Sequence, residues 1–203
     1  QALKKKKHLW EQYKKGIMQQ IFTQTLRFKD EQGNDFPEWE ERKLGEVCTI
    51  KSGLSLDQND KKEGYQVTRI ETISDGKINL NKIGYVSTQE DISNYKLKKG
   101  DILFSNINSV SHIGKTALVH HELNLYHGMN LLRLVAATNT HSVFLFYYLN
   151  TEFNRNYFKQ ICNKAVSQAS INQTELGKTP IPLPSLPEQQ KIATFLSALD
   201  EKI

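Results

Sequence analysis

Three stretches of this sequence are dense in serine, asparagine and glutamine, the side chains that can pair with the edges of nucleic-acid bases. They are Lys51–Ser55, the loop that follows Gly100–Phe104 and ends at Lys115, and Val166–Gln173. Asparagine and glutamine bind adenine through two hydrogen bonds, serine binds several bases, and lysine neutralises backbone phosphate. The stretches thus have side chains suited to contact with double-stranded DNA, but their composition alone favours plain polar loops over a DNA-binding surface.

The candidate DNA contacts divide by their chemistry. We expect Lys115 to reach a phosphate group, whereas Asn106, Asn108 and Gln168 are expected to address base edges. The complete set of predicted DNA-binding residues is Lys51, Ser52, Ser55, Arg69, Ser105, Asn106, Asn108, Ser109, His112, Lys115, Ser167, Gln168, Ser170 and Asn172.

Motifs for catalysis are weak by comparison. Ser109–Thr116 is similar to a phosphate-binding loop, but that loop needs a helix after its lysine, and Thr116–Val119 has the composition of a strand. Acid-x-lysine triplets typical of nucleases begin at Glu41, Asp60 and Asp200, as chance predicts in a chain with 27 basic and 22 acidic residues. There is no glycine-rich cofactor loop and no metal-ligand spacing. The sequence thus predicts no catalytic site, metal or cofactor. The alternatives are an autonomous nuclease or methyltransferase with a divergent site, and a structural interaction protein that uses its helices and never touches DNA.

The composition is that of an ordinary globular protein. Of the 203 residues, 38% are hydrophobic and 24% are charged, and no apolar run is long enough to span a membrane. The net charge is +5, but residues 1–29 hold eight basic residues and one acidic residue, so the remainder sums to −2. The start has no signal-peptide core and no initiator methionine, which suggests a fragment or a processed chain. We expect Cys48 and Cys162 to be buried thiols in a cytoplasmic protein.

Both ends of the chain carry apolar side chains at the spacing of three and four residues that is typical of a helix. Ser185 and Glu188 have the spacing of a capping box at the start of the second helix. The two helices enter and leave one domain, so we expect them to lie antiparallel and to cover each other's apolar stripe, or to pack on a partner subunit or a second copy. The residues of the two stripes are Leu3, Trp10, Tyr13, Ile17 and Ile21, and Ile192, Phe195, Leu196, Leu199 and Ile203.

Between these helices the pattern is that of an α+β domain, in which a mixed β-sheet comes first and helices follow. Helical patterns lie at Ser142–Leu149 and Glu152–Asn163. The predicted organisation is a helix over residues 1–29, a central domain over 30–186 and the start of a second helix over 187–203. Short β-type runs predict strands near Val47–Lys51, Gln66–Ile70, Tyr85–Ser87, Ile102–Ser105, Thr116–Val119 and Leu131–Val135.

Several motifs resemble the specificity subunits of type I restriction–modification enzymes. Leu183–Asp200 is similar to the segment that closes a target-recognition domain in that family, and Tyr13–Phe22 is similar to the end of the conserved helix before one. The resemblance covers essentially the whole chain. Further similarities lie, in order, at Lys43–Val47, at Lys51–Gly53, at Gly100–Phe104, at Ile113–Lys115 and at Ser167–Ile171.

This resemblance implies a non-catalytic protein in which residues 30–186 form a target-recognition domain that selects one half of a bipartite DNA site. It also implies that the helices scaffold methyltransferase subunits, which modify adenine, and that the restriction subunit is an indirect partner. A full subunit of the family has two recognition domains and this chain has one. The chain therefore resembles the second half of a subunit or a naturally half-sized form.

Overall fold

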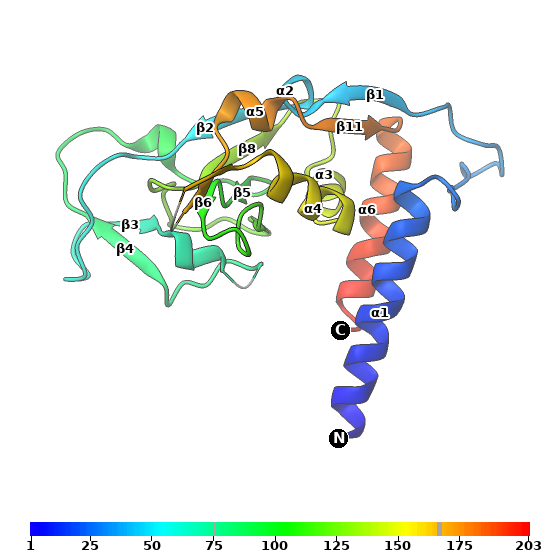
Figure 1. Cartoon of the computed structure of the whole chain (residues 1–203), viewed down its shortest axis with the longest axis horizontal. Helices are drawn as coiled ribbons and strands as arrows, with labels where there is room; N and C mark the ends of the chain where they lie inside the picture. The colour runs from blue at the N-terminus through cyan, green and yellow to red at the C-terminus, as the bar shows by residue number, and fades with distance from the viewer. Residues whose placement is uncertain (75, 166–167) are drawn as a thin grey trace.

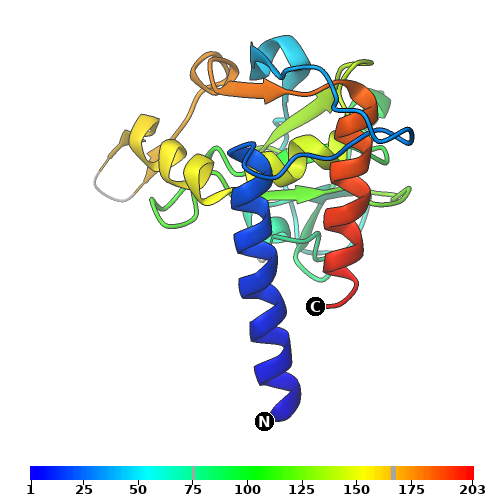
Figure 2. The ribbon, with the colours of Figure 1, turned by 90° about the vertical axis from the view of Figure 1, so that its right-hand side faces the viewer.

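Two helices from opposite ends of the chain lie side by side and run in opposite directions (Figure 1). They are α1 (Ala2–Phe22) and α6 (Leu186–Asp200) of a computed structural model that describes residues 1–74, 76–165 and 168–203. Figure 2 shows the same pair from the side, with α1 extending well beyond the end of α6. The predicted α+β fold with an antiparallel helical pair is confirmed. Among the described residues, no helix is both long and apolar enough to cross a bilayer.

The two predicted stripes cover each other only in part. Ile21 of α1 is fully buried, and so are Ile192 and Leu196 of α6. The first turns of α1 differ, because Leu3 and Tyr13 are 82% and 50% exposed. The packing of these exposed residues on a partner therefore stays a prediction.

The central sheet has the strand order β2-β8-β5-β7 and is antiparallel throughout. Its strands are β2 (Cys48–Ser52), β5 (Ile102–Phe104), β7 (Thr116–Leu118) and β8 (Leu132–Ala136). Successive side chains of a strand point to opposite faces, and here both faces are covered. Ile102 and Phe104 lie in the main core with α3 (Ser142–Leu149), whereas Leu103 lies in a second apolar cluster on the other side. Burial on both faces explains why this strand is a continuous apolar run.

Three smaller sheets surround the central one. The strands β3 (Tyr65–Thr68) and β4 (Ile83–Val86) form a separate hairpin with its own small core, at the end of the molecule away from the helical pair (Figure 1). The strands β1 (Glu40–Lys43) and β11 (Pro180–Leu183) pair at the place where the chain enters and leaves the domain. Prolines are tolerated there because a two-stranded sheet leaves half of its amides unpaired. The third sheet has the order β6-β10-β9 and contains β6 (Ile107–Asn108), β9 (Asn163–Lys164) and β10 (Ala169–Ser170).

Short helices complete the domain. In chain order they are α2 (Leu44–Val47), the 3-10 turns η1 (Ile70–Ile73) and η2 (Ser93–Tyr95), α4 (Glu152–Ile161) and α5 (Gln173–Gly177).

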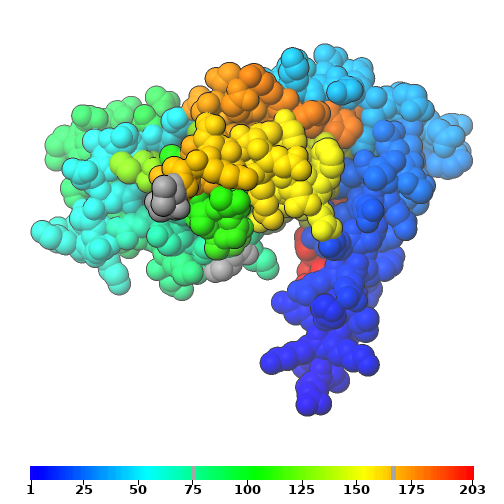
Figure 3. All heavy atoms as spheres, viewed as in Figure 1, coloured from blue at the N-terminus to red at the C-terminus, as the bar shows by residue number. Residues whose placement is uncertain are grey.

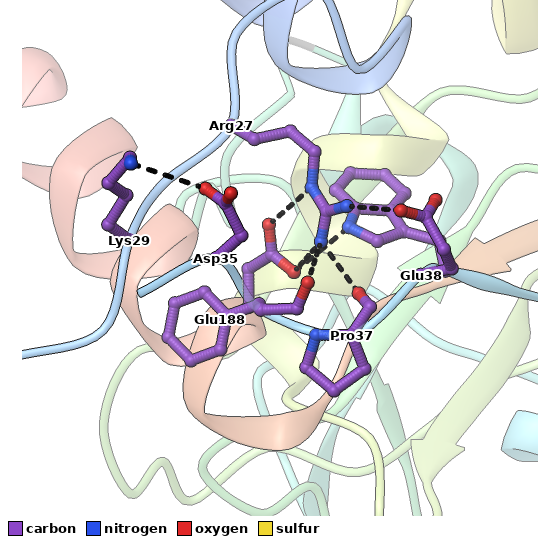
Figure 4. Close-up of polar contacts among 8 residues, drawn as sticks. Arg27, Lys29, Asp35, Pro37, Glu38 and Glu188 are labelled. Carbon is purple, nitrogen blue, oxygen red and sulfur yellow. Dashed lines mark hydrogen bonds and ion pairs between the residues drawn. The ribbon is translucent and has the colours of Figure 1, made fainter. Parts of the chain in front are cut away.

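A buried ion pair joins the segment after α1 to the first turn of α6 (Figure 4). The guanidinium of Arg27 donates to both carboxylate oxygens of Glu188, at 3.3 and 3.0 Å, and the indole of Trp39 donates to the same carboxylate at 3.0 Å. Glu188 is fully buried. Hydrogen bonding to Glu188 raises the pKa of Arg27, so the arginine stays charged. A buried carboxylate is tolerated only with such partners, and we call this cluster the Glu188 latch.

The predicted capping box at Ser185 is wrong. Ser185 does occupy the N-cap of α6, but its hydroxyl is buried and makes no hydrogen bond within the part of the chain that the structure describes. The Glu188 carboxylate, which the box would have directed back to the helix start, is occupied by Arg27 and Trp39 instead. Tertiary contacts therefore override the local motif.

Two further polar side chains of α6 hold neighbouring elements. The amide of Gln189 accepts a hydrogen bond from the backbone N–H of His141 and donates to the Asn139 and Pro184 carbonyls, which fixes the start of α3. At the other end of α6, Asp200 accepts hydrogen bonds from Lys14 of α1 and Tyr147 of α3. Helix α6 is thus tied to α3 near both of its ends, and Lys14 of α1 joins the contact at Asp200.

The latch makes a stability prediction. Replacing Glu188 by glutamine preserves its shape but leaves Arg27 without its buried charged partner, so we expect the free energy of unfolding to fall by about 3 kcal/mol. Chemical denaturation would measure the change. Glu38→Gln is the matched control, because Glu38 contacts the same arginine at 3.4 Å but its side chain is 92% exposed, and it should have no measurable effect. Equal effects of the two substitutions would contradict the assignment.

Candidate nucleic-acid interface

The structure brings the three polar stretches of the sequence together. In the small sheet, Asn108 of β6 lies opposite Ala169 of β10, which joins the second and third stretches. The first stretch is attached through a side-chain hydrogen bond of 2.6 Å from Gln173 to Ser52. In Figure 3 the loop after β6 (green) adjoins α4 and the segment leading into α5 (yellow to orange) on one face of the molecule. Residues more than a hundred positions apart therefore share one surface.

The loop between β6 and β7 is braced from within. Its ends are closed by hydrogen bonds from Ser105 N to Lys115 O and from Gly114 N to Ser105 O, at 2.8 and 2.9 Å. At its tip, the hydroxyls of Ser109 and Ser111 lie 2.9 and 3.0 Å from Nδ1 of His112. The loop is a closed, internally bonded turn and presents a defined shape.

Several predicted DNA contacts are engaged inside the protein. Ser105 is itself buried, with 1% exposure. Four further residues already form hydrogen bonds within the protein and would have to exchange them to contact a base or a phosphate. Their assignment as DNA contacts stays a prediction. The bonds run from Asn106 Nδ2 to Ile171 O (3.4 Å), from Asn108 Nδ2 to Ser105 Oγ (3.1 Å), from Lys115 Nζ to Ser74 O (2.6 Å), and from the Glu175 amide to Asn172 Oδ1 (2.8 Å).

Arg69 belongs to a different part of the domain. It follows β3, forms an ion pair of 2.6 Å with Asp60 and donates a hydrogen bond of 3.0 Å to Gln58. These contacts tie down the loop before β3. Arg69 also borders an open depression of about 640 Å³, whose walls carry both acidic and basic side chains, among them Lys62 and Glu71. The structure therefore does not place Arg69 within the small-sheet surface.

Four of the predicted contacts remain available to a ligand. Lys51, Ser55 and Gln168 are exposed and Ser170 is half-buried, and their side chains form no hydrogen bond with any residue that the structure describes. Ser167 lies outside the described residues.

Sequence reasoning missed three residues of this surface. Gln173 links two of the polar stretches, whereas Asn163 and Lys164 are exposed on β9. Asn163 was expected at the end of a helix, but α4 stops at Ile161 and the chain turns into a strand. The only signal in the sequence that could have placed Asn163 and Lys164 on this surface was the polar composition of the stretch that follows them.

Two candidate catalytic features of the described residues, the loop Ser109–Thr116 and the thiol of Cys48, do not have the geometry or the protonation state that their chemistry requires. Lys115 leads into strand β7 and not into a helix, so Ser109–Thr116 lacks the geometry of a phosphate-binding loop. Burial raises the pKa of Cys48 to about 12, so this thiol is protonated at neutral pH and is a poor nucleophile. Within the described ranges, no group of three or more histidine, cysteine or acidic side chains could hold a metal ion.

A second candidate surface lies on the helical pair. An apolar groove of about 500 Å³ runs along the exposed part of α1 and the end of α6. Its apolar walls come mainly from the two predicted stripes, and one lysine lies at its edge. The lining residues are Lys6, Leu9, Trp10, Tyr13, Phe195 and Leu199.

Comparison with known proteins places the chain in a family. Residues 37–203 match the model of the type I restriction modification DNA specificity domain. A protein of Methanocaldococcus jannaschii, named as the type I restriction enzyme MjaX specificity subunit, is 47% identical over 90% of this chain and 44% of its own length. The EcoBI specificity subunit of Escherichia coli is 26% identical over 80% of this chain and 35% of its own.

A solved structure shares the fold. The HsdS subunit from Thermoanaerobacter tengcongensis aligns with 99% of this chain and 47% of its own chain, with a TM-score of 0.63 and 21% identity. The present chain thus spans between about a third and a half of the length of these relatives.

The braced loop makes a prediction with an internal control. Gly114 has a φ of +75°, and an added Cβ would lie 2.6 Å from the Phe158 ring. We expect Gly114→Ala to destabilise the protein by about 2 kcal/mol or more. Gly16 lies in α1 with open space around it, so Gly16→Ala should stabilise by about 0.5–1 kcal/mol. Thermal unfolding should therefore shift in opposite directions, and shifts of the same sign would contradict this description of the loop.

Proposed function

We propose that this chain, which belongs to the family of type I restriction-modification DNA specificity domains, selects one half of a bipartite DNA sequence for its complex. The observation that carries the proposal is the convergence of three polar stretches on one surface of the central domain. Serine, asparagine, glutamine and lysine at such a surface can bind both base edges and phosphates. Residues 30–186 would form the recognition domain.

We assign no catalytic step to this chain itself. Adenine methylation would be carried out by methyltransferase subunits, and cleavage by a restriction subunit that contacts this chain indirectly. This division of labour is supported by the names of the relatives, which are specificity subunits of type I restriction enzymes. All of these activities act on cellular DNA, so we place the protein in the cytoplasm.

The helical pair would provide the scaffold for these partners. Leu9 and Tyr13 are 54% and 50% exposed beside the apolar groove, and an exposed apolar patch of this kind favours a protein partner. A methyltransferase subunit is the occupant we propose, and a second copy of this chain is the alternative. Lys4, Lys5 and Lys6 are exposed and form no ion pair with the residues that the structure describes, so they are also available for contact with phosphate.

The proposal can be tested with the full chain and a library of randomised duplex DNA, both alone and with the methyltransferase subunits. We expect repeated selection to enrich one sequence, and each mismatched base pair should weaken binding by about 1–3 kcal/mol. Binding should weaken as the salt concentration rises, because phosphate contacts release counterions. The isolated chain should neither transfer methyl groups from a labelled donor nor cut plasmid DNA in the presence of magnesium. Failure to enrich any sequence, or turnover proportional to this chain, would overturn the proposal.

A further inference from the structure

The pleat of the small sheet divides its side chains between two faces. Residues directly opposite each other in neighbouring strands share a face, and successive residues alternate. The ladder continues beyond the strands through hydrogen bonds of 2.8 Å from Ile171 N to Asn106 O and from Ala165 N to Gln168 O. With the register of β6, β10 and β9, the inner face holds Asn106, Asn108, Lys164, Ala169 and Ile171, and the outer face holds Ile107, Ser109, Asn163, Ala165, Gln168 and Ser170.

The middle of the inner face packs into the protein core, whereas Lys164 at the edge of this face is exposed. Ala169 and Ile171 are buried at 0% and 1% exposure and lie in the main apolar cluster. The two asparagines of this face direct their amides to acceptors within the protein, namely Ile171 O and Ser105 Oγ. The side-chain Oδ1 of Asn106 is also buried, and it has no hydrogen-bond partner among the described residues. These amides therefore brace the sheet, so, in a departure from the sequence-based expectation, we do not use Asn106 and Asn108 as base contacts.

The outer face has the opposite character. Asn163 and Gln168 are exposed, and their amides form no hydrogen bond with the residues that the structure describes. The residues directly opposite them, Ala165 and Ser170, are small, so a flat ligand can approach closely, and half-buried Ile107 of β6 borders the site on the same face. Two amides with free donors and acceptors are the groups that recognise adenine through its N6 and N7 atoms.

We propose that the outer face of the small sheet is the base-reading surface, and that Asn163 and Gln168 recognise adenine in the major groove. This inference rests on the proposed function. Neighbouring strands lie about 5 Å apart, and the major groove is about 12 Å wide and admits a two-stranded β-ribbon. The β9–β10 pair therefore fits the groove. Lys164 is exposed on the outermost strand, where its charge can contact the adjacent phosphates.

The test uses the full chain and the duplex that it selects from a randomised library. Asn163→Ala and Gln168→Ala remove the outer amides, and Asn106→Ala is the matched control from the inner face. Each outer variant should lose preference at one adenine and bind the selected duplex about five- to 150-fold more weakly, with little change for a scrambled duplex. Asn106→Ala should keep the preference and lower the melting temperature. Lys164→Ala should weaken binding to the selected duplex and to the scrambled duplex equally.

A change in the DNA provides a second measurement that does not depend on protein folding. Replacing the recognised adenine by 7-deazaadenine removes its N7 acceptor, and this should weaken binding of the unmodified chain but not of the matching alanine variant. If both outer variants keep the original preference, or if Asn106→Ala alters it, the inference is wrong and the proposed function stands. If the unmodified chain enriches no sequence, the proposed function and this inference both fail.

Discussion

The arrangement of this protein depends on one buried charge. Glu188 is fully buried, and its carboxylate is neutralised by Arg27 and further bound by Trp39. A buried carboxylate without such partners is strongly destabilising, so folding must bring these three side chains together. Arg27 follows α1, Trp39 precedes β1 and Glu188 begins α6. The latch thus joins the segment that enters the central domain to the helix that leaves it.

This constraint organises the rest of the molecule around a single junction. Beside the latch, β1 pairs with β11, and the helical pair extends away from the domain on one side (Figure 1). Asp200 and Gln189 then hold α3 against α6, and α3 covers one face of the central sheet. The small sheet is attached to the central sheet, because its strand β6 follows the central strand β5 after two residues. Its polar surface is consequently held at a defined position relative to the helices that would bind partner subunits.

Strong periodic patterns in the sequence predicted the main elements, and weak ones did not. The stripe of α6 and the apolar runs of β5 and β8 were recognisable because burial requires those residues at that spacing. The strands β6, β9 and β10 have only two residues each, too few for any period to emerge. Asn163 therefore seemed to continue a helix. The face to which Asn106 or Gln168 points depends on strand register, which only the tertiary structure provides. Local spacing also misassigned Glu188, because the competing interaction comes from Arg27, 161 positions away.

Our central proposal is that the chain recognises DNA sequence through the small sheet while the latch and helices hold that sheet in place. The most direct measurement is an experimental structure of the chain bound to its selected duplex. We expect the β9–β10 pair to lie in the major groove, with Asn163 and Gln168 at adenine edges and the Glu188 latch intact. A complex in which the duplex contacts another surface, such as the depression beside Arg69, and leaves the outer face in solvent would contradict it.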